Sequence, residues 1–176
     1  MKLAENFTLE ELTKSRTALR NDIDNIPNSE HIENLKALCG NILQPVRNHY
    51  GQVVTVNSGF RCEALEKILT HKSYIRWCEK RKLEVNEESW EKYFEGKSHP
   101  KGEAGDIEII GIPNIELAYW IRDNLEFDQL ILEFYNPADP QGGWVHVSYN
   151  MIHNRKQVLT ISKGGVVYGL PERHVI

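Results

Sequence analysis

The spacing of apolar residues along the chain predicts several helices. Apolar side chains recur at helical spacing over residues 29–46, with Pro45 inside the pattern. Because proline removes a backbone donor and clashes with the preceding turn, we expect Pro45 to kink or divide this helix. A capping-box pattern, in which Thr8 accepts from the first turn and Glu11 reaches back, begins a shorter helix. Another helix is expected over residues 113–125.

Strands are expected where β-branched residues cluster or where apolar and polar residues alternate. The expected strands cover residues 53–56, 106–110, 129–134 and 144–149, and a closing hairpin follows at 158–161 and 166–168. If the strands beginning at Gln129 and Trp144 pair antiparallel, the period-two alternation places Glu133 and His146 on one face. The order of elements predicts one α+β domain, residues 1–176, with a central antiparallel sheet flanked by helices.

Composition narrows the possible partners. The 176 residues include 21 Lys and Arg against 25 Asp and Glu, a net charge of -4, so we expect no nucleic-acid partner. The first residues lack an apolar core of signal-peptide length, and no segment approaches about 18 uninterrupted apolar residues. We therefore expect synthesis in the cytoplasm and no membrane insertion. Three cysteines without a close pair are expected to be reduced thiols: Cys39, Cys62 and Cys78.

Three residues form a candidate metal site. His99 and Asp106 lie seven positions apart across a glycine-containing turn, and His146 lies on a separate expected strand. Imidazole nitrogen and carboxylate oxygen bind zinc well, and a catalytic zinc uses three protein ligands while leaving a position open for water. The pattern therefore predicts a Zn²⁺ site at His99, Asp106 and His146.

The motifs around these residues resemble a family of zinc peptidases. Its signature is Ser-His or Ser-x-His, then Asp, and later Trp-x-His, which here reads Ser98-His99, Asp106 and Trp144-Val145-His146. Further matching pieces occur in order, namely residues 7–12, Pro45-Val46-Arg47, Ser58-Gly59-Phe60-Arg61 and residues 127–133. The family contains D-alanyl-D-alanine carboxypeptidases, vancomycin-resistance dipeptidases, phage L-alanyl-D-glutamate endopeptidases and hedgehog signalling domains. The chain is most similar to its small single-domain branch.

The resemblance implies a hedgehog or D-Ala-D-Ala peptidase-like fold and a hydrolase that cuts a peptide bond in peptidoglycan stem peptides. The activity would be that of a D,D-carboxypeptidase or an endopeptidase, for example a phage or prophage endolysin that acts in cell wall degradation after release from the cytoplasm. Small relatives pass from the arginine motif to the histidine motif in far fewer residues. The charged, helical stretch at about 66–96 is therefore expected to be an insertion beside the cleft.

The resemblance also implies roles for individual residues. Glu133 matches a glutamate of hedgehog domains and is our candidate general base. In the dipeptidase branch the base lies three residues before the last histidine, where this chain has Gly143, and Asp139 is the reserve candidate. Arg61 matches an arginine that contacts the substrate carbonyl or carboxylate. The remaining candidates are three serines expected to orient these groups and a tryptophan expected either to wall the site or to lie in the core: Ser58, Ser98, Ser148 and Trp144.

Other interpretations remain open from the sequence. The metal could organise a non-catalytic interaction module, or the chain could be a phage structural component. The sequence does not reveal the oligomeric state or the bond that is cleaved. Five further histidines lack motif support and are not expected to be ligands, although His153 is near the site in sequence: His31, His49, His71, His153 and His174.

Overall fold

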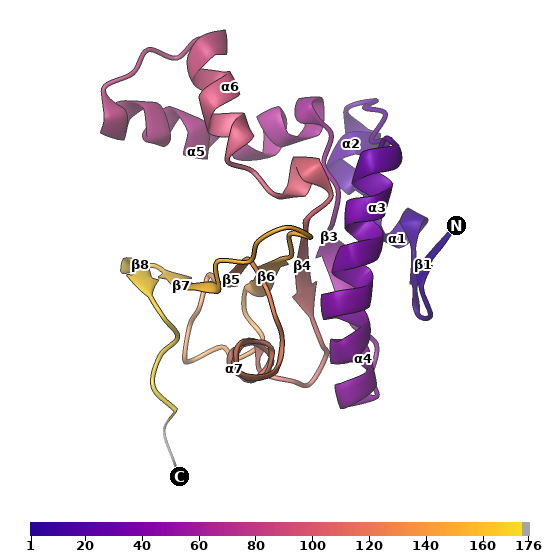
Figure 1. Cartoon of the computed structure of the whole chain (residues 1–176). Coiled ribbons are helices and arrows are strands. Elements are labelled where there is room, and N and C mark those ends of the chain that lie inside the picture. The colour runs from indigo at the N-terminus through magenta and orange to yellow at the C-terminus, as the bar shows by residue number, and fades with distance from the viewer. Residues whose placement is uncertain (174–176) are drawn as a thin grey trace.

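The computed structural model describes residues 1–173 and confirms the α+β class (Figure 1). His174, which we did not expect to be a ligand, lies outside these residues. The main sheet has the strand order β3 (Thr55–Ser58), β4 (Ala104–Glu108), β6 (Trp144–Ser148), β5 (Gln129–Glu133), β7 (Gln157–Ser162) and β8 (Gly165–Tyr168). A small antiparallel pair, β1 (Lys2–Ala4) and β2 (Phe7–Thr8), lies near the N-terminus.

The sheet is mixed, which corrects the expected antiparallel arrangement. Four strand pairs are antiparallel, but β5 and β7 run parallel. Ser148 at the end of β6 pairs with Gln129 at the start of β5, so the chain leaves β6 where β5 begins. A strand that starts at this end of the sheet and lies beside β5 must run in the same direction as β5. The predicted closing hairpin is confirmed as β7 and β8.

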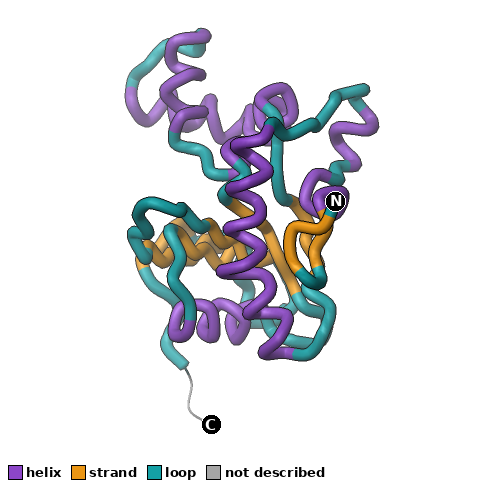
Figure 2. The backbone as a smooth tube through the Cα atoms, turned by 45° about the vertical axis from the view of Figure 1, so that its right-hand side comes forward, coloured by secondary structure: helices purple, strands orange, loops and turns teal. Residues whose placement is uncertain are grey.

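One face of the sheet is buried under helices. The helix α7 (Asn114–Asn124) lies beneath the strands, and α3 (Ser29–Leu38) and α4 (Gln44–Tyr50) run as one long rod across the sheet (Figures 1 and 2). Four strand residues point into this core and are fully buried: Leu130, Leu132, Val145 and Val147. The alternation that buries them turns the intervening residues, His146 among them, to the opposite face.

Pro45 divides the long helix, as the sequence predicts. The five residues Cys39–Leu43 form a π-helical turn between α3 and α4, and Pro45 occupies the first turn of α4. A π-turn widens the helix by one residue, so it accommodates a proline that can neither donate a backbone hydrogen bond nor fit against the preceding turn. The buried Leu38, Ile42 and Val46 remain on the core side.

The short N-terminal helix α1 (Leu9–Thr13) is capped as predicted. Glu11 N donates to Thr8 Oγ1, and the Glu11 carboxylate accepts from the Thr8 backbone. A second short helix, α2 (Arg16–Arg20), was not predicted from the sequence. Strand β3 begins at Thr55, two residues later than expected, because Thr55 pairs with Glu108, the last residue of β4.

The charged stretch after Arg61 forms a helical hairpin. Its helices are α5 (Glu63–Arg81) and α6 (Glu87–Glu95), and they project from the end of the molecule opposite the C-terminus (Figure 1). A separate small core holds them together, centred on Tyr74, Cys78, Trp90 and Tyr93. A 3-10 turn, η2 (His99–Lys101), then returns the chain to the sheet.

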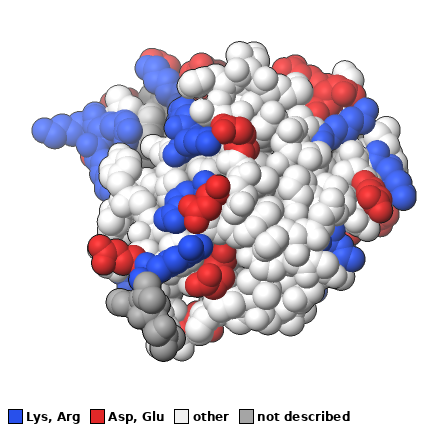
Figure 3. Space-filling model, turned by 60° about the horizontal axis from the view of Figure 1, so that its bottom comes forward, with Lys and Arg blue, Asp and Glu red and all other residues white. Residues whose placement is uncertain are grey.

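Three further observations concern the sequence expectations. None of the helices among residues 1–173 combines the length and apolar character needed to cross a bilayer. The cysteines are unpaired, and burial raises the pKa of the Cys39 thiol to about 12, with the Glu11 charge adding to the effect. On the face shown in Figure 3, acidic and basic side chains are interspersed around a broad uncharged area.

Candidate metal centre

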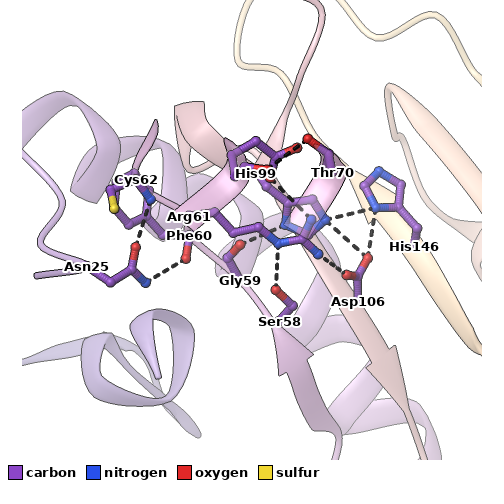
Figure 4. Close-up of polar contacts among 11 residues, drawn as sticks. Asn25, Ser58, Gly59, Phe60, Arg61, Cys62, Thr70, His99, Asp106 and His146 are labelled. Atoms are coloured by element: carbon purple, nitrogen blue, oxygen red, sulfur yellow. Dashed lines mark hydrogen bonds and ion pairs between the residues drawn. The ribbon is translucent and has the colours of Figure 1, made fainter. Parts of the chain in front are cut away.

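Three elements bring the predicted metal ligands together. Asp106 of β4 pairs directly with His146 of β6, so these side chains emerge next to each other on the face of the sheet opposite the helix-covered core. His99 lies in the η2 turn above them (Figure 4). All three residues are buried, and each is no more than 6% exposed. The segments that carry them are separated by up to 47 positions in sequence.

The three potential donor atoms form a tight triangle. His146 Nδ1 lies 2.9 Å from Asp106 Oδ1, and His99 Nε2 lies 3.2 Å from both of these atoms. Tetrahedral zinc with bonds of about 2.0–2.1 Å to N and O requires donor atoms about 3.3 Å apart. The spacing of the triad is close to that requirement. Within residues 1–173 it is also the one group of three His, Cys, Asp or Glu residues with this geometry.

The hydrogen bonding of His99 leaves one ring nitrogen able to bind a cation inside the triangle. His99 Nδ1 lies 2.7 Å from the carbonyl oxygen of Gly59, and because a carbonyl can only accept, Nδ1 carries the proton. In the neutral ring, Nε2 then directs a lone pair at the carboxylate of Asp106. Burial lowers the pKa of His99, against the opposing effect of Asp106, so the neutral ring is favoured. A bound metal ion converts these opposed lone pairs into ligands.

Asp106 is ionised within this cluster. Burial alone would raise the pKa of its carboxyl, but the close contacts with His99 and His146 hold that pKa below its usual range. An ionised carboxylate with two neutral imidazoles is a donor set that zinc prefers in catalytic sites. These residues therefore fit the predicted Zn²⁺.

Arg61 joins the metal site to the rest of the cleft. Its Nη2 donates to Asp106 Oδ2 at 2.6 Å, and its Nε donates to Ser58 Oγ at 2.8 Å (Figure 4). Its Nη1 lies 3.3 Å from Glu66 Oε2. The guanidinium is thus fixed by three partners, and Ser58 orients Arg61 instead of a metal ligand. The sequence did not single out Glu66, whose side chain is almost fully buried.

A second clamp holds the loop that carries Arg61. Asn25 Nδ2 donates to the carbonyl oxygens of Thr13 and Phe60, and Asn25 Oδ1 accepts from Cys62 N at 2.7 Å. Gly59 lies so close to α1 that a Cβ atom there would collide with the Leu12 carbonyl oxygen. The loop is therefore fixed on both sides of Arg61. Asn25 was missed because nothing in its local sequence reveals a partner 35 positions away.

Glu133 lies on the same face of the sheet as the triad. It pairs with Trp144, two residues from the pair Ile131 and His146, so Glu133 and His146 are diagonal neighbours. Burial is the largest effect on the pKa of Glu133 and raises it. The neighbouring His146, Arg61 and Lys97 lower this pKa and Asp106 raises it, and the net result is a raised pKa. The carboxylate is thus electrostatically coupled to the site. A raised pKa suits a group that accepts a proton near neutral pH.

The other two positions considered for a base differ from Glu133. Gly143 has φ +74°, and a Cβ there would collide with the Glu133 carbonyl oxygen, so this position cannot carry a carboxylate without a backbone shift. Asp139 lies on an exposed loop and lines a separate cleft with Tyr135 and Lys163. Glu133, by contrast, lies on the face of the sheet that carries His146 and Asp106.

The remaining candidate residues, two serines and a tryptophan, differ in what they contact. Ser148 Oγ accepts from Gln129 N at 3.0 Å and so ties β6 to β5, and its partner is not a residue of the triad. Ser98 precedes the η2 turn and lines a polar cleft that also contains Ser148 and His153. Trp144 is half-buried, and it lines a cleft together with Arg61 and Asp106. Its position in that cleft favours the expectation that Trp144 forms a wall of the site over the alternative that it lies in the core.

Comparison with protein families gives an independent result. Residues 5–69 match the family model described as Peptidase M15. This match supports the M15 zinc peptidase family, without distinguishing a subgroup. No curated protein matches the chain. The matched segment contains Ser58 and Arg61 but ends before His99, so the convergence of the metal triad is a separate observation that points to the same chemistry.

Proposed function

We propose that this protein is a zinc-dependent peptidase that hydrolyses a peptide bond in peptidoglycan stem peptides. The observation that carries the proposal is the buried triangle of His99 Nε2, Asp106 Oδ1 and His146 Nδ1, with edges of 2.9–3.2 Å. Zinc held there would polarise the scissile carbonyl and lower the pKa of water from about 15.7 towards about 7. The match of residues 5–69 to Peptidase M15 supports this reaction class.

The other polar residues of the site have complementary tasks. The Glu133 carboxylate accepts a proton from the attacking water and returns it to the nitrogen of the leaving amine. The Arg61 guanidinium, held by Ser58 and Glu66, keeps Asp106 in place and presents positive charge where the carbonyl oxygen becomes negative. Because His99, Asp106 and His146 are buried, the charges at the site act in a region poor in water.

The substrate class is supported by the resemblance of the motifs Ser58–Arg61, Ser98–Asp106 and Trp144–His146 to peptidases of the bacterial cell wall. On this basis the bond is one that a D,D-carboxypeptidase or an endopeptidase cleaves. A phage or prophage lysis enzyme that reaches the wall after release from the cell fits this proposal.

The test is digestion of purified peptidoglycan by the purified protein, with release of new amino termini as the readout. Cleavage that is lost with a chelator and restored by zinc supports the proposal, and mass analysis of the products names the bond. One zinc per chain without cleavage of peptidoglycan from any of several wall types would overturn it. That result would instead favour a zinc-containing interaction module.

A further inference from the structure

A cleft of about 620 Å³ runs along the outer edge of β3 and ends at the metal site. One wall is β3 itself, residues 55–58, and the other is the segment 14–17, which comprises the link between α1 and α2 and the first two residues of α2. Leu69 of α5 contributes an apolar side chain, and Arg61, Asp106 and Trp144 lie where the cleft meets the triad. The lining thus combines a strand edge, an apolar side chain and basic groups.

We propose that this cleft binds an extended peptide segment that carries a carboxylate, with the peptide backbone paired to β3. The inference rests on the proposed peptidase function and specifies how its substrate is held. Three observations carry it, namely the free edge of β3, the unpaired cations opposite that edge and the continuity of the cleft with Asp106.

The edge of β3 offers unused backbone groups. In the order of the main sheet β3 is terminal and pairs only with β4. Among the described residues, no hydrogen bond from another element reaches the backbone of 55–58 on its outer side. A strand edge of this kind adds an extended peptide through main-chain hydrogen bonds, with alternate side chains directed to the two sides.

The opposite wall supplies positive charge. Lys14 and Arg16 are exposed, line the cleft, and form no ion pair with a described residue. Arg61, the third cation of the cleft, is already paired with Asp106 and Glu66. Lys14 and Arg16 are therefore the cations available to a ligand, and their spacing of two residues suits a carboxylate on an extended chain.

The cleft also leads to the candidate metal site. Ser58, the last residue of β3, pairs with Asp106, and Asp106 itself lines the cleft, so a peptide that follows the β3 edge reaches the end of the cleft where a proposed metal ligand lies. The carboxylate could belong to an acidic side chain or to a free chain terminus. Both sources offer the same chemistry to Lys14 and Arg16, and the test below separates them.

The experiment measures peptide binding by NMR, using ¹⁵N-labelled, zinc-loaded protein with Glu133→Gln to prevent turnover. The probes are the blocked peptide Ac-Thr-Glu-Val-Glu-Thr-NH₂, its Gln counterpart, and the Gln peptide with a free carboxyl terminus. We expect amide shifts to concentrate at 14–17 and 55–58, and the Glu peptide or the free-terminus peptide to bind roughly fivefold more tightly than the neutral one. Which of the two gains affinity identifies the source of the carboxylate.

A matched pair of variants tests the charges. Lys14→Gln with Arg16→Gln should remove the preference for the carboxylate, whereas Arg20→Gln, an exposed arginine of α2 outside the cleft, should leave it intact. N-methylation of alternate peptide nitrogens should abolish binding if the backbone pairs with β3. Equal affinities for all three peptides, or shifts remote from β3, would overturn the proposal.

The two proposals fail in different ways. Zinc-dependent cleavage of peptidoglycan that is unchanged by the Lys14 and Arg16 substitutions, with no preference among the probe peptides, would remove the cleft proposal and leave the peptidase. Carboxylate-dependent shifts at β3 without any cleavage would leave a peptide-binding cleft and remove the peptidase.

Discussion

The two carboxylate oxygens of Asp106 have different partners, and one of these partners is Arg61. Asp106 Oδ2 accepts a hydrogen bond of 2.6 Å from Arg61 Nη2, while Oδ1 faces the two histidines at 2.9 and 3.2 Å. The arginine therefore fixes the direction in which the remaining oxygen points. Through this pairing the Arg61 loop and the proposed metal ligands form one unit, although 45 positions separate Asp106 and Arg61 in sequence.

The first prediction concerns Arg61. Arg61→Lys should retain the fold and bound zinc but lower kcat/KM for peptide cleavage at least tenfold, about 1.4 kcal/mol in the transition state. A lysine is a point charge and cannot reach Ser58, Glu66 and Asp106 together. Kinetics and metal analysis on the same preparations provide the measurement. Wild-type kcat/KM in this variant would show that the planar guanidinium is dispensable.

Glu66 should act on the reaction through Arg61. Glu66→Gln removes a charge that is almost fully buried, and we expect an approximately threefold to tenfold loss of turnover together with a loss of about 2 kcal/mol in unfolding free energy. The matched control is Glu79→Gln, an exposed glutamate of the same helix without an ion pair among the described residues, which should stay within about 0.5 kcal/mol of wild type. Equal effects of the two substitutions would contradict a positioning role for Glu66.

Asn25 should stabilise the loop that carries Arg61. Asn25→Ala removes three hydrogen bonds to the backbone of residues 13, 60 and 62, so we expect a destabilisation of about 2–3 kcal/mol in chemical denaturation. Asn124→Ala, which removes one exposed bond to Trp120, is the comparison and should cost less than about 1 kcal/mol. A smaller effect at Asn25 than at Asn124 would argue against the clamp.

The ionised Glu133 side chain should lower the unfolding free energy of the metal-free protein. Because burial raises its pKa, the ionised form is disfavoured in the folded state, and the penalty is present above the pKa of the unfolded chain. Glu133→Gln should therefore increase the unfolding free energy at pH 7, and this gain should vanish below about pH 4, where both states are protonated. The same variant should retain zinc and lose turnover. A gain that persists at low pH would assign the effect to packing.

Much of the candidate site is readable from the sequence because its signals are local. Strand alternation predicts that Val145 and Val147 are buried while His146 faces outward, and the structure agrees. The capping box at Thr8 and the break at Pro45 likewise depend on neighbouring residues. These features need no knowledge of distant contacts.

The features that were missed depend on pairing between distant segments. The two-residue shift of β3 follows from its register against β4, and the parallel pair of β5 and β7 follows from where β6 ends. The short helix α2 buries only Ala18 and leaves Leu19 exposed, so it has no apolar stripe to detect. Asn25 and Glu66 are common polar residues whose importance appears only once the Arg61 loop is folded.

The most direct test of the account is the zinc content of the purified wild-type protein and of His146→Ala, measured after dialysis against buffered zinc and removal of excess metal. We expect one zinc per chain in the wild type and almost none in His146→Ala, with His153→Ala as a folded control that retains the metal. Equal zinc in wild type and His146→Ala, or none in either, would contradict a metal centre at His99, Asp106 and His146.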